Sequence, residues 1–461
     1  MKQRFISRAV VSVLCTLLLT GMSATKADET YPNSETWQKN IGELAAKHAQ
    51  TPSDETIAFA YAEAAAQLGM FAQSQELLKP LLDGDNPYPP AIRLSAQTAY
   101  MLGNYAEAEA LYRTLVNLSP EWKEQAESGL LMVYYQTNQF GKSQNLSLAY
   151  DPDFSLGALM RAFGDDTPYQ IEWSQSNQAV IPFVRTDPLP LVEAVIDGQT
   201  YRFVIDTGAP EIHLDDALAD SLGIQPIGEY EGNYAGDQSL SIRYGILDSV
   251  AFPGVVIESV PVILHPSEAI RAQSAVYDHE YTVDGIIGTG FLKQFLATLD
   301  YPGNRLILRQ RNGENAASDE SATELPFVLA STHILLSRGE MNGKEVNVFL
   351  DSGLAMDGVA ILVPNATIPY ANITVSETFA MEGTGGAGET ELQISVLNID
   401  AFQLGGLPEA RNALGVSGIF PESIYFNGEI GVFVDTLLSH NFLRDYVWTL
   451  DFDSMKMYFS R

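Results

Sequence analysis

The sequence predicts a protein of two unlike parts: an all-α helical-repeat solenoid, followed by an all-β region of two similar lobes. Three observations predict this. Residues 36–148 are rich in Ala, Leu, Gln and Glu with helical periodicity. From Leu189 onward, short Val, Ile, Leu and Phe runs alternate with turn signals. The β region also resembles itself across the polar stretch 312–323, which indicates a tandem duplication.

The composition is that of a globular protein with a strongly acidic surface. The 461 residues include 26 Lys or Arg and 58 Asp or Glu, which gives a formal net charge of −32. A polyanion repels phosphate backbones and no basic block offsets this locally, so nucleic acid is excluded as a partner. The single cysteine excludes a disulfide framework and a cysteine zinc cluster. The six histidines lack ligand-like spacing, so we expect neither a metal nor another cofactor.

Residues 1–27 have the features of a cleaved signal peptide. Three basic residues lie among the first eight positions, an apolar run from Ala9 to Leu19 follows, and small residues lead to Ala27. The run is too short for a stable membrane-spanning helix, and no later stretch reaches the necessary length. We therefore expect an exported bacterial protein, periplasmic or secreted, with no membrane span after signal removal. An uncleaved anchor is the alternative.

The helical part, residues 28–150, repeats at an interval of 34 residues. This period and its small-residue positions resemble tetratricopeptide repeats, in which paired helices stack into a solenoid. The resemblance implies a surface for a protein or peptide partner, and a generic helical bundle is the alternative. The matching series are Ala62, Ala65, Leu68, Gly69 and Phe71, then Ala96, Ala99, Leu102, Gly103 and Tyr105, with a weaker third copy at Phe140.

A bridge, residues 151–187, connects the two parts. It begins with a helical pattern from Phe154 to Phe163 and continues as polar, extended sequence. The β region then divides into a first lobe, residues 188–311, a polar linker, residues 312–324, and a second lobe, residues 325–461.

The duplication is clearest at two Asp-Thr/Ser-Gly triplets. Asp206-Thr207-Gly208 recurs 145 residues later as Asp351-Ser352-Gly353, and an unbroken apolar strand precedes each triplet. Further on, Ile286-Ile287-Gly288 recurs as Leu437-Leu438-Ser439, at a shift of 151. A carboxylate at the end of an apolar strand is costly unless it pairs or accepts hydrogen bonds. Two loops related by pseudo-symmetry can bring two such carboxyls together.

This arrangement resembles the pepsin and retropepsin superfamily of aspartic proteases, over about Pro188 to Arg461. The resemblance implies a two-lobed acid protease fold and a catalytic dyad of Asp206 and Asp351, without a metal or cofactor. Two adjacent carboxyls share one proton, so one activates a water and the other protonates the scissile carbonyl. The family pattern also assigns the bracing of the two loops to Thr207, Gly208, Ser352 and Gly353.

In this family a β-hairpin flap covers the substrate. The resemblance assigns the flaps to Tyr234 and Gly236 in the first lobe, and to Gly385 and Gly386 in the second. Glycines 383, 385 and 388 also fit a dinucleotide-binding fingerprint, but a strand-like segment follows them where that fingerprint requires a helix. A flap is therefore favoured.

Two departures from the family pattern lie in the second lobe. Leu354 follows the triplet where a small residue is usual, and Ser439 replaces the glycine behind the loop. The leading interpretation is an exported aspartic endopeptidase whose helical repeats bind a substrate or partner. The alternative is a non-catalytic peptide-binding or scaffold protein with degenerate lobes. The two retained acids favour the enzyme, whereas Leu354 and Ser439 favour the binding protein.

Overall fold

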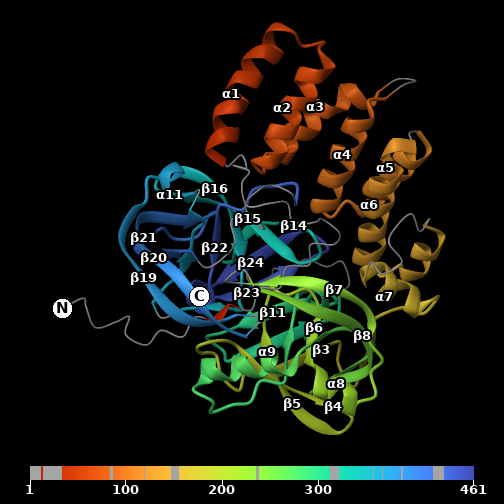
Figure 1. The fold of residues 1–461 in the computed structure, drawn as a ribbon, viewed down its shortest axis with the longest axis vertical. Coiled ribbons are helices and arrows are strands. Elements are labelled where there is room, and N and C mark those ends of the chain that lie inside the picture. Colours follow the sequence, from red (N-terminus) through yellow and green to blue (C-terminus); the bar gives the residue numbers. More distant parts are fainter. Residues whose placement is uncertain are drawn as a thin grey trace.

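A helical domain precedes two β lobes and a sheet that both lobes share (Figure 1). The predicted order of an all-α part and a two-lobed all-β part is thus confirmed. Among the described residues, no helix is long and apolar enough to cross a membrane. The computed structural model describes residues 12–13, 34–83, 87–118, 120–146, 155–234, 238–311, 321–356, 358–365, 367–385, 388–418 and 430–461.

The helices of the first domain pack against their neighbours in the chain, and α1, α4 and α7 also contact the lobes. Figure 1 shows them from red to yellow, above the green first lobe and the blue second lobe. The helices are α1 (Ser34–Gln50), α2 (Glu55–Gln67), α3 (Phe71–Leu82), α4 (Pro89–Met101), α5 (Tyr105–Leu118), α6 (Lys123–Gln136) and α7 (Ser155–Phe163), with short 3-10 helices η1 (Pro120–Trp122) and η2 (Phe140–Asn145).

The same turn ends α2, α4 and α6. The backbone has positive φ at Gly69, Gly103 and Asn138, and each next amide donates to a carbonyl five residues back, the 6→1 bond of a Schellman motif. The repeat of 34 and then 35 residues is therefore a repeat of one helix–turn unit, whereas the more specific resemblance to tetratricopeptide repeats stays a prediction. The three hydrogen bonds are Met70 N to Ala65 O, Asn104 N to Ala99 O and Gln139 N to Tyr134 O, each 2.8 Å long.

The first lobe is an eight-stranded sheet in the order β2-β9-β6-β10-β5-β4-β8-β7. Short helices α8 (Asp216–Ser221), α9 (Ser267–Ala272) and η3 (Gln273–Tyr277) connect its strands, and α10 (Thr289–Leu292) follows β10. The strands are β2 (Gln170–Trp173), β4 (Leu191–Ile196), β5 (Gln199–Ile205), β6 (Ile212–Asp215), β7 (Ile227–Tyr234), β8 (Gln238–Phe252), β9 (Val255–His265) and β10 (Gly285–Ile287).

The second lobe repeats the topology of the first. In lobe 1, β10 pairs parallel with β5 and antiparallel with β6, and in lobe 2, β22 pairs in the same way with β16 and β18. Helices α11 (Thr367–Tyr370) and α13 (His440–Leu443) flank this sheet. Its strands are β14 (Val328–Ala330), β15 (Ile334–Met341), β16 (Lys344–Leu350), β17 (Leu354–Ala355), β18 (Ile361–Leu362), β19 (Thr374–Gly385), β20 (Gly388–Leu404), β21 (Ala410–Ser417) and β22 (Thr436–Leu438), joined by β1 (Ser12–Val13).

A third sheet joins the lobes, in the order β13-β24-β23-β11-β12-β3. Its centre is the antiparallel pair β11 and β23, in which Thr298 lies opposite Thr449 with their hydroxyl oxygens 2.6 Å apart. These residues are related by the shift of 151, so a pseudo-two-fold axis passes between them. The strands are β3 (Gln178–Pro182), β11 (Leu296–Asp300), β12 (Arg305–Arg309), β13 (Thr323–Pro326), β23 (Val447–Asp451) and β24 (Lys456–Ser460).

The expected bridge, residues 151–187, is more than a connection. Helix α7 confirms its helical pattern, but β2 pairs with β9 in the first lobe and β3 pairs with β12 in the shared sheet. In β3, Ala179 and Ile181 are buried between exposed neighbours, as a strand with one covered face requires. After the helical domain, the strands therefore begin at Gln170, ahead of the expected start of the lobe. Most of the expected linker, residues 312–320, lies outside the described residues.

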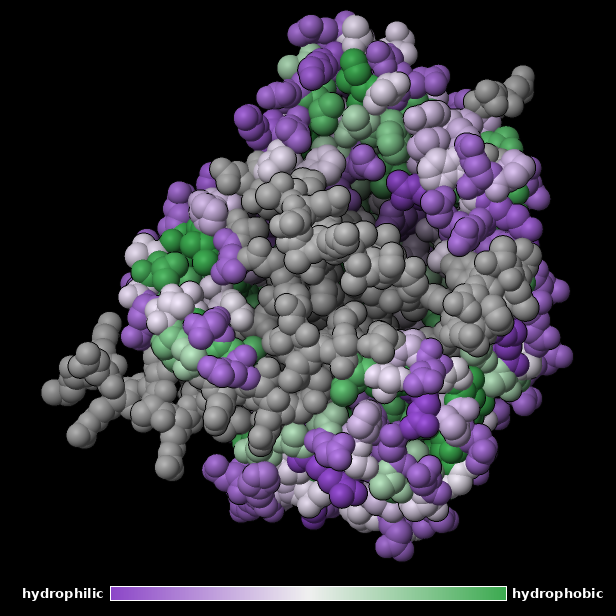
Figure 2. Space-filling model, viewed as in Figure 1, coloured by the Kyte–Doolittle hydropathy of each residue, from purple (hydrophilic) through white to green (hydrophobic). Residues whose placement is uncertain are grey.

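Tight turns and a polar exterior agree with the sequence. Both residues of Asp197-Gly198 and of Asn342-Gly343 have positive φ, the conformation of the two-residue hairpin turns that these sequences favour. Figure 2 shows that the rims of the helical domain and of both lobes are mainly hydrophilic, as the large number of acidic residues leads one to expect.

Candidate active site

The two triplets occupy matching places at the ends of buried strands. Asp206 follows β5 and Asp351 follows β16, and all four side chains of Asp206, Thr207, Asp351 and Ser352 are fully buried. The amide of Asp206 donates to the carbonyl of Ile287 on β10, and that of Asp351 donates to Leu438 on β22, both at 3.0 Å. The predicted apolar segments behind the loops therefore anchor both of them.

The glycine of each triplet orients the carboxyl group of its own loop. The Gly208 amide donates to Asp206 Oδ1 at 2.7 Å, and the Gly353 amide donates to Asp351 Oδ1 at 2.8 Å. Gly353 also lies against the other acid, because a Cβ atom on it would overlap the Asp206 carboxyl group. At this position a glycine is needed for the two loops to approach each other.

The hydroxyl residues of the triplets hold the two loops together. Thr207 Oγ1 donates to the carbonyl of Leu350 at 2.8 Å and accepts from the Ser352 amide at 3.0 Å. Ser352 Oγ donates to the carbonyl of Ile205 and accepts from the Thr207 amide, both at 2.9 Å. These four hydrogen bonds are symmetric about the pseudo-two-fold axis and join one lobe to the other.

The two carboxyl groups meet between the loops. The Asp206 and Asp351 carboxyls are close enough for the charge of one to act on the other. Burial, and then the nearby charge of Asp351, raise the pKa of Asp206 well above its usual range, while the amides of Gly208 and Gly353 lower it. The pair is therefore suited to hold one proton and one negative charge at neutral pH.

Behind the first loop, the backbone at Gly288 leaves no room for a side chain. A Cβ atom on Gly288 would lie 2.5 Å from the carbonyl oxygens of Ala209 and Glu211. The Gly288 amide donates to the Glu211 carbonyl at 2.9 Å, and Thr289 Oγ1 donates to the Thr207 carbonyl at 2.9 Å.

The longer second loop accommodates both departures from the family pattern. The amide of Ser439 donates to the carbonyl of Ala360, which lies nine positions after Asp351, whereas Glu211 lies only five positions after Asp206. The extra residues leave space for the Ser439 side chain, whose hydroxyl donates to the Val359 carbonyl at 2.8 Å. They also form β17, in which Leu354 is buried. Neither residue displaces Asp351 from its partner.

Both expected flaps are hairpins in matching places. Tyr234 ends β7, which pairs with β8, and Gly385 lies opposite Gly388 where β19 pairs with β20. The segment from 383 to 388 is thus part of a hairpin rather than the start of a helix, in agreement with the flap interpretation. Gly236 and Gly386 lie outside the described residues.

A strand lies between the second flap and the second loop. Ser12 and Val13 pair antiparallel with Ala355 and Leu354 of β17, and parallel with Thr384 and Gly385 of β19. An extended segment therefore fits next to the Asp351 loop, with pairing partners on both edges. The sequence held no signal for this groove, because β17 has only two residues.

Buried charged and titratable groups behind the first loop were also missed by sequence reasoning. Glu211 and Lys293 are buried, yet neither belongs to a motif. The rings of His213 and His265 stack with their centroids 4.7 Å apart, and burial lowers the pKa of both. In the part of the chain that the structure describes, no group of three or more His, Cys, Asp or Glu is placed to hold a metal ion.

Comparisons with known proteins give one family match and similar solved structures. Residues 192–291 match the family model described as aspartyl protease, a segment that contains the first triplet and Gly288. Among solved structures, the crystal structure of a retropepsin-like aspartic protease from Rickettsia conorii is similar, with 16% sequence identity, 31% of this chain and 94% of that chain covered, and a TM-score of 0.20. No match is found among curated proteins.

Proposed function

We propose that this chain, whose residues 192–291 match an aspartyl protease family model, is a retropepsin-like endopeptidase whose Asp206 and Asp351 activate a water molecule. The observation that carries the proposal is the symmetric contact of the two triplets. Four hydrogen bonds join the loops, and the carboxyls of Asp206 and Asp351 meet between them. Such a pair has the acid and the base that peptide hydrolysis needs.

The mechanism follows from the shared proton. The ionised carboxyl takes a proton from the water as its oxygen attacks the scissile carbonyl carbon, and the protonated carboxyl donates its proton to the carbonyl oxygen. When the tetrahedral intermediate collapses, the C–N bond breaks and the leaving amine takes the proton that came from the water. The second proton returns from the gem-diol hydroxyl to the other carboxylate, so the dyad ends with one proton again.

The expected substrate is an extended peptide. The pairing of Ser12 and Val13 between β17 and β19 supports this, because a strand in that place is held along its main chain. Main-chain pairing tolerates many side chains, so specificity would come from the pockets for alternate residues. The repeated helix–turn units support a further role of the helical domain in binding a protein substrate or partner. Export through residues 1–27 to the periplasm or beyond belongs to the same proposal.

The non-catalytic alternative has lost its main support. Leu354 and Ser439 favoured a degenerate second lobe, but the longer loop accommodates both of them. Two carboxyls in contact inside the protein cost folding free energy. A simple binding groove gains nothing from them, whereas hydrolysis requires them.

The test is peptide-bond cleavage of an unfolded protein mixture by residues 28–461 between pH 3 and 8. We expect the wild type to cleave and Asp351→Asn to lose at least about a hundredfold in rate. Asp248→Asn is the matched control, because Asp248 is exposed on β8, and its rate should equal that of the wild type. An inert wild type across the pH range, or an equally active Asp351→Asn, would refute the two-carboxyl mechanism.

A further inference from the structure

The first catalytic loop contacts the helical domain through a buried carboxyl. Glu211 ends the loop that begins at Asp206, and its side chain is fully buried. Its Oε1 accepts from the hydroxyl of Tyr135 on α6, and its Oε2 accepts from the hydroxyl of Tyr169, just ahead of β2. One of the two donors to this carboxyl therefore comes from the helical domain.

A buried lysine makes a second contact with the same helix. Lys293 follows α10, and its Nζ donates to the carbonyl of Gln136 at 3.2 Å and to Gln136 Oε1 at 2.5 Å. Gln136 is the last residue of α6, where free carbonyls and the helix dipole favour a cation. The same Nζ lies 4.9 Å from the centre of the Tyr135 ring. The last two residues of α6 thus contact both buried charged groups.

Glu211 and Lys293 also depend on each other. Burial raises the pKa of Glu211, and the positive charge of Lys293 lowers it. Burial lowers the pKa of Lys293, with the charge of Glu211 acting in the opposite direction. Because buried ionisable groups are costly without their partners, the Tyr135 donor and the Gln136 acceptors on α6 fix the position of both side chains.

Two hydrogen bonds link Glu211 and the segment after β10 to the loop that holds Asp206. The backbone carbonyl of Glu211 accepts from the Gly288 amide, and the next residue, Thr289, binds the carbonyl of Thr207. A Cβ atom on Gly290 would lie 2.6 Å from Glu211 Oε2, so the Glu211 side chain is packed directly against this segment. A shift of the Glu211 side chain would therefore move the segment that holds the Asp206 loop.

The second lobe differs at the matching place. Its loop has Ala360 where the first has Glu211, so at this position the second loop has no carboxyl group. The helical domain contacts this lobe at the turn between β14 and β15, where Gln136 Nε2 donates to the Thr332 carbonyl at 2.9 Å and the Tyr100 hydroxyl donates to the Ser331 carbonyl at 2.6 Å. The amide of Phe433, just ahead of β22, also donates to the carbonyl of Gln67 on α2. Contact through the buried carboxyl of Glu211 thus distinguishes the first loop from the second, which has Ala360 in its place.

We propose that Tyr135 and Gln136 are positioning residues for the first catalytic loop, so that α6 is part of the catalytic unit rather than of a separate recruiting module. This inference rests on the proposed function. The helical domain then sets the rate of the chemical step in addition to any binding role, and its α6 cannot detach from lobe 1 without loss of activity.

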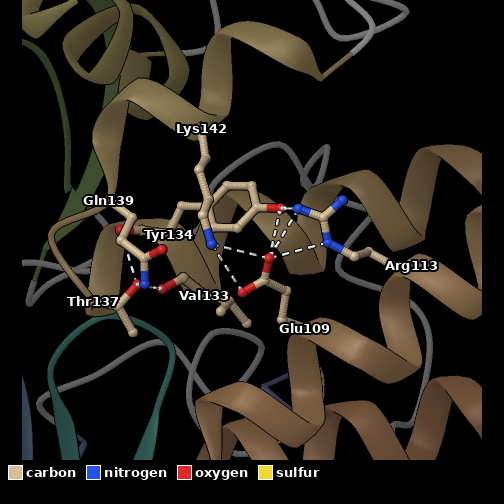
Figure 3. A network of polar contacts seen from close by, with 7 residues as sticks. All are labelled: Glu109, Arg113, Val133, Tyr134, Thr137, Gln139 and Lys142. Atoms are coloured by element: carbon tan, nitrogen blue, oxygen red, sulfur yellow. Dashed lines mark hydrogen bonds and ion pairs between the residues drawn. The ribbon is translucent and has the colours of Figure 1, made fainter. Parts of the chain in front are cut away.

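The test compares two single-hydroxyl variants of neighbouring tyrosines on α6. Tyr135→Phe removes a donor to Glu211. Tyr134→Phe is the control, because the hydroxyl of Tyr134 contacts only Arg113 and Glu109 within the helical domain, as Figure 3 shows. On one fluorogenic peptide chosen from the cleavage products, we expect Tyr135→Phe to lower kcat at least about tenfold with KM within about twofold, and Tyr134→Phe to change neither.

Amide hydrogen exchange of the same proteins separates positioning from lost stability. In Tyr135→Phe we expect exchange to rise at least about fivefold in residues 203–211 and to stay unchanged in residues 348–353 of the second loop. Gln136→Met keeps the side-chain length but removes one of the two acceptors of Lys293, the side-chain oxygen, and we expect it to act in the same direction.

Three outcomes overturn the proposal: equal kcat values for the two tyrosine variants, a rise in exchange that is equal in both loops, or faster exchange in the first loop with unchanged kcat. Exchange does not depend on cleavage, so the proposed function can fail separately. A wild type that cleaves nothing, with loop-specific exchange in Tyr135→Phe, would refute the peptidase while keeping α6 as the support of the first loop.

Discussion

Replacing Thr207 by Val removes one hydroxyl from the contact between the two triplets while keeping the shape of the side chain. The variant loses the donor to Leu350 O and the acceptor for the Ser352 amide, and both of these backbone groups remain buried. An unsatisfied buried polar group costs about 1–3 kcal/mol, so two of them predict a loss of about 2–6 kcal/mol in the free energy of unfolding.

Thr449→Val is the matched control. It also removes a threonine hydroxyl next to the pseudo-two-fold axis, but that hydroxyl contacts only the side chain of Thr298. One side-chain partner without a backbone group predicts a loss of about 1 kcal/mol. The two variants therefore separate the value of the loop contact from that of a buried hydroxyl in general.

The assay is urea unfolding followed by tryptophan fluorescence, since Trp448 is buried in the shared sheet. With a urea dependence of about 3 kcal/mol per molar, we expect the midpoint to fall by about 1 M for Thr207→Val and by about 0.3 M for Thr449→Val. Equal shifts, or a smaller shift for Thr207→Val, would show that the hydroxyls of the triplets do not hold the lobes together.

Two further predictions concern glycine and histidine. Gly288→Ser should abolish cleavage, because its Cβ would lie 2.5 Å from two carbonyl oxygens. Ser439→Gly loses only the hydrogen bond to the Val359 carbonyl and should keep its activity within about fivefold. Similar activities of the two variants would contradict the packing argument. Burial lowers the pKa of His265 to about 3 in the folded protein. Below about pH 6.5 the unfolded chain therefore binds more protons than the folded one, and the free energy of unfolding should fall as the pH drops from there toward 3. From urea unfolding, the free energies of unfolding at pH 7.5 and 4.5 should differ by about 3 kcal/mol more in wild type than in His265→Gln, and equal differences would contradict this.

The sequence was most informative where the chemistry is local. A loop that holds a carboxyl at a strand end needs consecutive residues, so Asp206 and Asp351 left the same short signal twice. Glu211, Lys293 and Tyr135 meet only in the folded protein, from three distant segments, and a lone charged residue carries no pattern. This is why the dyad was predicted and its support was not.

Residue types alone did not show how the second loop holds Leu354 and Ser439. Leu354 and Ser439 indicated a degenerate lobe, because each was compared with a loop of fixed length. The structure makes room for both through a longer loop, a compensation that appears only when the partner of Ser439 is known. In the same way, β2 and β3 have four and five residues, too few for alternation to distinguish them from an extended connection.

The antiparallel pair of β11 and β23 has a consequence for how the site assembles. Because both halves lie on one chain and share a sheet, the two carboxyls come together in a first-order step. The effective concentration of one lobe near the other is set by the tether and not by the amount of protein. The two halves can also differ in sequence, as they do where the first loop has Glu211 and the longer second loop has Ala360. Two identical subunits encoded by one sequence could not differ in this way.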